Sequence, residues 1–126
     1  MFNKVIMVGN LTQDPELRYT ASGTAVANLR IAVTSKFRSG DEYKDETLFI
    51  DVVVWGKQGE SCSQYLAKGR QVLVEGRLQE RSWESDGQTR RKTEIVANTV
   101  RFLGRKGEGG GQGGPAPDEV SDIEPF

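Results

Sequence analysis

Five runs rich in β-branched, aliphatic and aromatic residues constrain the fold of this 126-residue chain most strongly. Each run is bounded by glycine, asparagine or charged residues, a pattern typical of β-strands. We therefore predict strands over Asn3–Leu11, Val26–Ser35, Thr47–Trp55, Arg70–Ser82 and Arg91–Leu103. Alternation is clear in Val72–Leu78, where Gly76 predicts a bulge or a sharp bend. The charged turn segments Ser39–Asp45 and Glu84–Gln88 predict two long hairpins that project from the domain.

Helical spacing replaces alternation between the third and fourth runs. Cys62, Tyr65 and Leu66 recur at helical spacing within Lys57–Lys68, and Gly69 follows as a stop signal. The order of three strands, one short helix and two strands matches an all-β fold, a five-stranded Greek-key barrel of the oligonucleotide-binding type (OB-fold). An SH3-like barrel and a small sandwich stay open as alternatives at this stage.

The charges divide the chain into two parts. Residues 1–106 hold all 17 Lys and Arg with 13 acids, a net charge of +4, whereas residues 107–126 hold five acids and no Lys or Arg. Seven glycines in residues 104–114, followed by two prolines, predict a flexible coil. The predicted organisation is an OB-fold domain over residues 1–104 and a disordered tail. That tail comprises a glycine-rich linker over residues 105–117 and an acidic tip over residues 118–126.

Composition argues against several functional classes. The chain has no histidine and one cysteine, Cys62, which excludes a Ser–His or Cys–His nucleophile pair, an intrachain disulfide and a His/Cys metal cluster. Acids such as Asp51 and Glu75 lie in alternating strands, where a solvent-facing position is the ordinary explanation. We expect no enzyme, no metal site and no cofactor. No apolar stretch is long enough for a signal-peptide core or a membrane span, so we expect a soluble cytosolic protein.

Aromatic residues set among cations indicate a surface for single-stranded nucleic acid. Three rings lie within two residues of a cation and near predicted strand ends: Phe37, Trp55 and Trp83. Exposed rings allow bases to stack, and neighbouring cations bind phosphates. One such ring by itself is better explained as a core residue, but three together favour a binding surface. Phe49 is ambiguous by itself, because its alternation with Asp51 is compatible with either face.

Ordered motifs then identify a family. The motifs are Asn3–Leu11, Asp14–Tyr19, Ala25–Asn28, Val54–Lys57, Tyr65–Gly69 and Val74–Gly76. With them the chain resembles the bacterial single-stranded DNA-binding proteins over nearly its whole length. The resemblance implies an OB-fold, a homotetramer around which single-stranded DNA wraps without strong sequence preference, and no cofactor.

The resemblance also implies which residues bind DNA. The stacking positions of the family fall on Phe37, Phe49, Trp55 and Trp83. The phosphate-binding positions fall on Lys4, Arg18, Lys57, Lys68, Arg81 and Arg90. Many members have tryptophan where this chain has the two phenylalanines, and a basic family position is Gln79 here. Arg77, Arg91 and Lys92 are candidates to compensate for that missing charge.

The tail resembles the acidic tip of the family, which ends in Pro-Phe. The matching residues are Asp122, Ile123, Glu124, Pro125 and Phe126. A ring fits an apolar pocket, carboxylates pair with Arg or Lys, and proline limits the conformations to be ordered. The resemblance implies that the tip recruits replication, recombination and repair proteins, and that the protein acts at the nucleoid. A primosomal replication protein, which normally lacks such a linker and tip, and a protein-interaction barrel are the alternatives.

Overall fold

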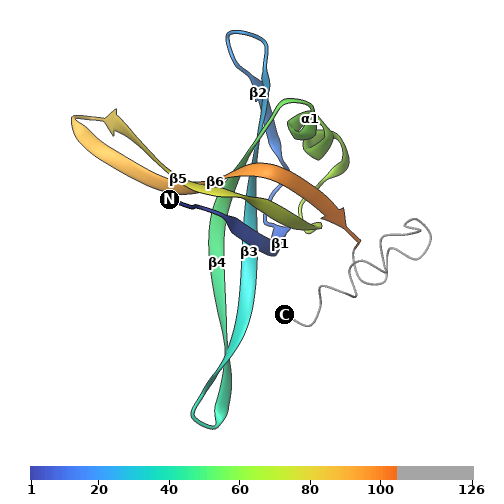
Figure 1. Cartoon of the computed structure of the whole chain (residues 1–126), viewed down its shortest axis with the longest axis vertical. Coiled ribbons are helices and arrows are strands. Elements are labelled where there is room, and N and C mark those ends of the chain that lie inside the picture. The colour runs from blue at the N-terminus through green and yellow to red at the C-terminus, as the bar shows by residue number, and fades with distance from the viewer. Residues whose placement is uncertain (105–126) are drawn as a thin grey trace.

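The computed structural model describes residues 1–104, so the predicted linker and tip lie outside the described residues. This part of the chain contains six strands and one helix (Figure 1). They are β1 (Val5–Leu11), β2 (Glu16–Tyr19), β3 (Ala25–Ser39), β4 (Glu42–Trp55), α1 (Gly56–Tyr65), β5 (Gln71–Ser85) and β6 (Gln88–Leu103). Among residues 1–104, no helix is long and apolar enough to cross a membrane.

Hydrogen bonds close the five long strands into a barrel. The strands are ordered β1-β5-β6-β4-β3, and β1 pairs back onto β3 at Asn10 and Leu11. The β4–β6 pairing is parallel and the other pairings are antiparallel. The closed barrel, with its helix between β4 and β5, confirms the predicted OB-fold.

The predicted irregularity at Gly76 is present. The β5–β6 register shifts between Glu75 and Gly76, which marks a bulge in the pairing. A side chain at Gly76 would overlap the backbone carbonyl of Val96. Glycine is therefore required where β5 bends, because the neighbouring strand approaches too closely for a Cβ.

Aliphatic side chains fill the barrel. Alternate residues of β4 from Ile50 to Val54 are buried, and α1 adds Cys62. Leu66, directly after the helix, is also buried and donates its N–H to the Cys62 carbonyl. The sequence pattern groups Tyr65 with this buried set, but its ring is 59% exposed. The helix ends at Tyr65 and the backbone becomes extended at Leu66, and it is the Leu66 side chain that enters the core.

Strand β2 is not among the five predicted strands. Its four residues pair with Ala25–Asn28 at the start of β3. The segment lies inside the motif Asp14–Tyr19, and its four residues are at the lower limit of length over which alternation indicates a strand. The pairing places β2 beside the start of β3 and beside α1, as Figure 1 shows.

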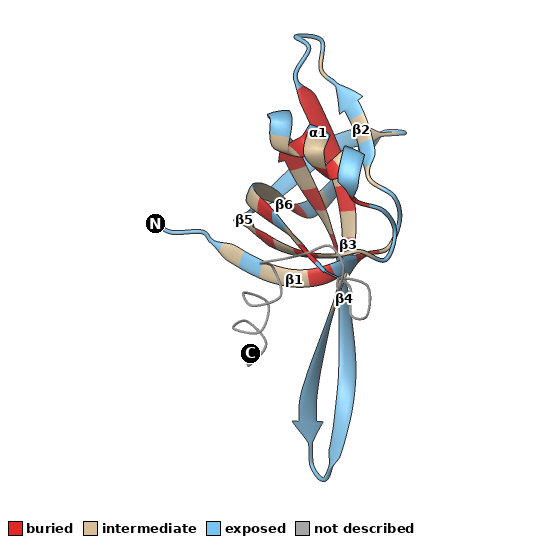
Figure 2. Cartoon of the chain, turned by 90° about the vertical axis from the view of Figure 1, so that its right-hand side faces the viewer, coloured by how far each residue is buried: buried red, intermediate tan, exposed pale blue. Residues whose placement is uncertain are grey.

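Two paired arms extend from the barrel: the β3–β4 arm (residues 34–49) and the β5–β6 arm (residues 77–93). Figure 1 shows both arms projecting as long ribbons, and Figure 2 shows the β3–β4 arm exposed along its whole length. The projecting hairpins are as predicted, but their charged segments are mostly paired strand and not loop. Gly40 at φ +67° and the pair Asp86–Gly87 at φ +54° and +77° provide the left-handed residues of tight hairpin turns.

Candidate nucleic-acid interface

The outer face of the sheet formed by β3, β4, β6 and β5 carries most of the candidate residues. Alternation buries every second residue of β4 from Ile50 to Val54 and leaves Asp51 and Trp55 on the outer face. Arg30 of β3 lies opposite Asp51, and Asp51 lies opposite Glu94 of β6. Strand β5 continues this face with its alternate residues Arg77, Gln79, Arg81 and Trp83.

A groove of about 410 Å³ lies on this face. Three arginines line it, and they are Arg18 of β2 with Arg77 and Arg81 of β5. Its apolar part consists of Val26, Val53, Val96 and the ring of Trp55. An apolar and aromatic surface between cations offers contacts for both parts of a nucleotide, the base and the phosphate.

The four candidate stacking rings are all exposed. The exposed fractions are 45% for Phe37, 53% for Phe49, 49% for Trp55 and 39% for Trp83. A core position is the ordinary explanation for a single large ring, and these fractions exclude it for all four. Each ring therefore has surface available for contact with a ligand.

The structure groups three of these rings and separates the fourth. Phe49, Trp55 and Trp83 share the alternation phase of the groove-lining residues on their own strands. Phe37 lies opposite Lys44 and shares the phase of the buried residues of β3, so it points from the other face of the β3–β4 arm.

Four of the six candidate cations lie near the grouped rings. Arg18 and Arg81 line the groove itself. Arg90 of β6 lies directly opposite Trp83, and Lys57 is in the first turn of α1, two residues after the groove-lining Trp55. These cations are spread along the path from the barrel to the β5–β6 arm.

Lys4 and Lys68 do not line the groove. The ammonium of Lys4 forms an ion pair with Glu75 of β5, which is therefore paired and not simply solvated. Lys68 is exposed after α1, and its backbone N–H donates to a carboxylate oxygen of Asp14 at 2.9 Å. DNA that reaches these two lysines has to extend beyond the groove.

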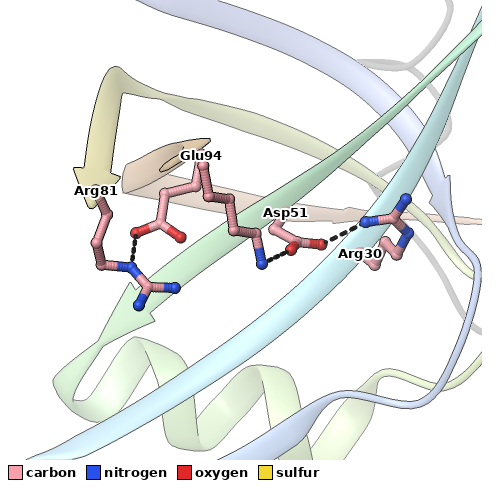
Figure 3. A network of polar contacts seen from close by, with 5 residues as sticks. Arg30, Asp51, Arg81 and Glu94 are labelled. Carbon is pink, nitrogen blue, oxygen red and sulfur yellow. Dashed lines mark hydrogen bonds and ion pairs between the residues drawn. The ribbon is translucent and has the colours of Figure 1, made fainter. Parts of the chain in front are cut away.

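Five charged residues on the outer face form a cluster that the sequence analysis does not anticipate (Figure 3). Arg30 donates through Nη1 to Oδ1 of Asp51 at 3.0 Å, and Lys92 pairs with Oδ2. Arg81 donates through Nε to Oε2 of Glu94 at 3.4 Å. Burial alone raises the pKa of Asp51, but hydrogen bonds from Lys92 and Arg30 outweigh it and hold that pKa below its ordinary value.

The two arginines of this cluster also contact aromatic rings. The guanidinium carbon of Arg30 is 5.7 Å from the centroid of the Phe49 ring. The guanidinium carbon of Arg81 is 5.0 Å from the centroid of the Trp83 ring. Both distances are within the range of cation–π attraction.

Tyr19 is a further groove residue that sequence reasoning misses. It is 57% exposed, and its hydroxyl donates to Oε2 of Glu60 at 3.2 Å. That hydrogen bond to a carboxylate raises the pKa of Tyr19. Its place directly after Arg18, within a recognisable motif, is the one local signal that points to the groove.

Cys62 lies in the core, away from this surface. Burial raises the pKa of its thiol to about 11, so the thiol stays protonated near neutral pH. Among residues 1–104, no group of three or more His, Cys, Asp or Glu side chains is arranged to hold a metal ion.

Comparison with known sequences gives a match over the described domain. The sequence profile of the Single-strand binding protein family matches residues 2–103. The single-stranded DNA-binding protein of Treponema pallidum is 49% identical over 102 residues, which are 81% of this chain and 58% of that relative. This chain therefore spans less than two thirds of that relative's length.

Two solved structures are similar in fold. A deletion mutant of the single-stranded DNA binding protein from Thermus aquaticus superposes with a TM-score of 0.76 at 31% identity, covering 85% of this chain and 53% of that one. A Plasmodium falciparum SSB complex with ssDNA gives a TM-score of 0.76 at 29% identity, covering 82% of this chain and 96% of that one.

Proposed function

This chain belongs to the single-strand binding protein family, and we propose that it binds single-stranded DNA without strong sequence preference through the outer face of its barrel. The observation that carries the proposal is the exposure of Phe49, Trp55 and Trp83 on one face that also holds the arginine-lined groove. Stacking is tolerant of sequence because every base has a π-face, and each stacked base contributes roughly 1–3 kcal/mol.

The proposed DNA path uses both kinds of contact. Bases stack on the three grouped rings, and Phe37 adds a fourth ring on the other face of the β3–β4 arm. The phosphates are bound by cations along the groove and beyond it, which are Lys4, Arg18, Lys57, Lys68, Arg81 and Arg90. Arg77 lines the groove as well and supplies a charge close to Gln79.

Titration with oligo(dT) tests this function. The chain has two tryptophans, Trp55 and Trp83, and both belong to the proposed surface, so saturation should quench most of the intrinsic fluorescence. Affinity should fall with added salt at a logarithmic slope of about −0.7 per neutralised phosphate. A duplex of the same length is the control, because paired bases do not reach the rings. Equal affinity for the duplex, or a quench below about a tenth, would contradict stacking as the basis of binding.

We also propose that the chain assembles as a homotetramer. One edge of β1 is paired with β5 from Val5 to Asn10, whereas among the described residues its other edge is paired only at Asn10 and Leu11. Ile6 on this strand is 62% exposed. An unpaired strand edge beside exposed apolar surface favours pairing with another chain. Sedimentation of the full chain should give four times the 13.9 kDa monomer mass, and a monomer would contradict the proposal.

For the tip, we propose recruitment of replication, recombination and repair proteins at the nucleoid. The residues concerned are Asp122, Ile123, Glu124, Pro125 and Phe126. Deleting residues 118–126 should abolish partner binding and spare DNA binding. At low salt it should strengthen DNA binding, because four acidic side chains that compete with phosphate are removed. Deleting Phe126 alone should abolish partner binding and leave DNA affinity unchanged. Loss of DNA affinity in the longer deletion would contradict this division of labour.

A further inference from the structure

Arg30 on the groove face links a carboxylate to an aromatic ring. Its Nη1 donates to Asp51 at 3.0 Å, and its guanidinium lies 5.7 Å from the centroid of Phe49. Lys92 pairs with the second oxygen of the same carboxylate. The carboxylate is thus held from two sides, and one of its two partners contacts a proposed stacking ring.

Arg81 repeats this arrangement on the β5–β6 arm. Its Nε donates to Glu94 at 3.4 Å, and its guanidinium lies 5.0 Å from the centroid of Trp83. We call each set of three residues an acid–arginine–ring unit. The two units are neighbours in the sheet, because Asp51 lies opposite Glu94 in the parallel pairing of β4 with β6 (Figure 3).

Carboxylates are unexpected on a surface for single-stranded DNA. Glu94 is only 3% exposed, and the side chain of Asp51 is 15% exposed. Burying a carboxylate costs free energy unless it is paired, and a negative charge beside the groove also opposes phosphate binding. Their position therefore indicates a role that offsets both costs.

The arginines explain what that role is. A guanidinium is a rigid plane with five N–H donors, so a bond to a carboxylate restricts its orientation and leaves other donors for a phosphate. A guanidinium held against one face of a ring leaves the opposite face for a base. Without the carboxylate, the half-exposed Arg30 and Arg81 side chains would sample many rotamers.

We propose that Asp51 and Glu94 are positioning residues for DNA binding, and that each holds its arginine against a ring so that ring and guanidinium together receive one nucleotide. The proposal rests on the proposed function, single-stranded DNA binding. It predicts an effect opposite in sign to that of simple electrostatics, because neutralising either acid makes the surface more positive and yet weakens binding.

The test measures the affinity of the full chain for one length of oligo(dT) at fixed salt. Glu94→Gln and Asp51→Asn should each weaken binding by about two- to fivefold, the size expected when one exposed cation–π contact is lost. Glu80→Gln is the matched control, because it removes the same charge from an exposed position of β5 in the opposite alternation phase. Equal or tighter binding by the Glu94 and Asp51 variants would overturn the proposal.

A second measurement separates positioning from a merely structural role. Arg81→Lys keeps the charge at a half-exposed position and loses the planar group, so it tests the unit even where Glu94→Gln impairs folding. If Glu94 acts through Arg81, the double variant should bind no more weakly than Arg81→Lys alone. Additive losses would overturn this part of the proposal.

Fluorescence gives an independent signature. In a Trp55→Phe background the emission reports Trp83 alone. Glu94→Gln and Arg81→Lys should each shift this emission, whereas Glu80→Gln should not. Unchanged emission in both Glu94→Gln and Arg81→Lys would overturn the positioning role.

Binding by the wild type distinguishes failure of the positioning role from failure of the proposed function. If the wild type fails to bind oligo(dT), the proposed function fails, whereas if it binds and the acid variants bind as well, only the positioning role fails.

Discussion

The barrel and its two arms are formed by the same strands, but the barrel part of each strand packs in the core and the arm part is exposed. Along β3, burial alternates from Ala27 to Ile31, whereas every residue from Thr34 to Ser39 is exposed. Strand β5 changes in the same way after Gly76. One half of each of these strands therefore contributes to the core and the other half does not, as Figure 2 shows for β3.

This difference explains where binding residues occur. A core position accepts few side chains, because packing penalises changes of size and shape. Arm positions carry no such constraint, so they accommodate rings and charges such as Phe49, Trp83 and Arg90. We expect substitutions in the buried core of the barrel to change the free energy of unfolding, and substitutions of exposed arm residues to change DNA affinity.

A matched pair of leucines should give the largest contrast. Leu29 is 1% exposed in the barrel, and Leu48 is 47% exposed in the β3–β4 arm. Leu29→Ala should lower the free energy of unfolding by about 2–5 kcal/mol, because it leaves a cavity. Leu48→Ala should change it by less than about 0.5 kcal/mol. Urea unfolding measures both, and similar losses would show that the arm is part of the cooperative core.

Gly59 of α1 gives a second test of close packing in the barrel. Alanine normally stabilises a helix relative to glycine by about 1 kcal/mol. At Gly59 a Cβ would lie 2.5 Å from the Val54 carbonyl oxygen and 3.3 Å from the Ala27 nitrogen. Gly59→Ala should therefore destabilise the fold by about 1–3 kcal/mol, as expected for overpacking. The exposed Gln64→Ala in the same helix is the control, and a stabilising Gly59→Ala would contradict the close approach.

Substitution of Trp83 tests whether an arm residue affects DNA affinity and not stability. Trp83→Ala should weaken binding of oligo(dT) by about 1–3 kcal/mol, the cost of one lost base stack. The unfolding midpoint should stay nearly constant, because the ring is exposed and lies beyond the barrel. Trp83→Phe retains a ring and should recover most of the affinity. A stability loss in Trp83→Ala with unchanged binding would reverse the assignment.

Asp51 lies on the barrel wall at the base of the β3–β4 arm, and its stability effect should depend on pH. Its pKa is lowered in the folded protein from the ordinary value of 3.8, so the stabilisation is present above that value and is lost as pH falls through the folded pKa. Asp51→Asn should cost roughly 1 kcal/mol near pH 7, the upper value for partly exposed ion pairs. The difference from wild type should shrink below about pH 4. A constant difference would assign the effect to packing.

Local signals indicated five of the six strands and the helix, and the family motifs then favoured the OB-fold over an SH3-like barrel or a small sandwich. Alternation, turn residues and the stop at Gly69 indicated these elements along the chain, and Gly76 indicated the bulge that the register shift confirms. Rings beside cations likewise identified three exposed aromatic residues, Phe37, Trp55 and Trp83, and the family resemblance added Phe49. These features depend on residues that are neighbours in the sequence.

These local signals do not indicate which strands that are distant in the sequence pair with one another. No local pattern places β4 parallel to β6, and only this pairing brings Asp51 beside Glu94. The paired length of the arms was underestimated, because charges on both faces of a ribbon resemble a loop in the sequence. The face of Phe49 was left open by its alternation with Asp51, and the placement of Phe37 and Phe49 on opposite faces depends on the register of β3 with β4.

The smallest expected effect is the coupling between the two phenylalanines of the β3–β4 arm. Phe37 and Phe49 lie in opposite alternation phases, opposite Lys44 and Ala32 respectively. If each ring stacks its own base, each alanine variant should lose about 1–3 kcal/mol of binding free energy. The losses should add, with a coupling below about 0.5 kcal/mol, because the rings share no partner.

A positive control for coupling exists at the base of the same arm. Phe49 contacts Arg30, so Phe49→Ala combined with Arg30→Ala should be less than additive. Coupling between Phe37 and Phe49 as strong as in this control would place both rings on one nucleotide. DNA would then have to pass around the edge of the ribbon, and the grouping of Phe49 with Trp55 and Trp83 on a separate face would no longer describe the binding path. An unchanged affinity in Phe37→Ala alone would instead confine binding to the groove face, so the two double variants decide whether one or both faces of the arm contact DNA.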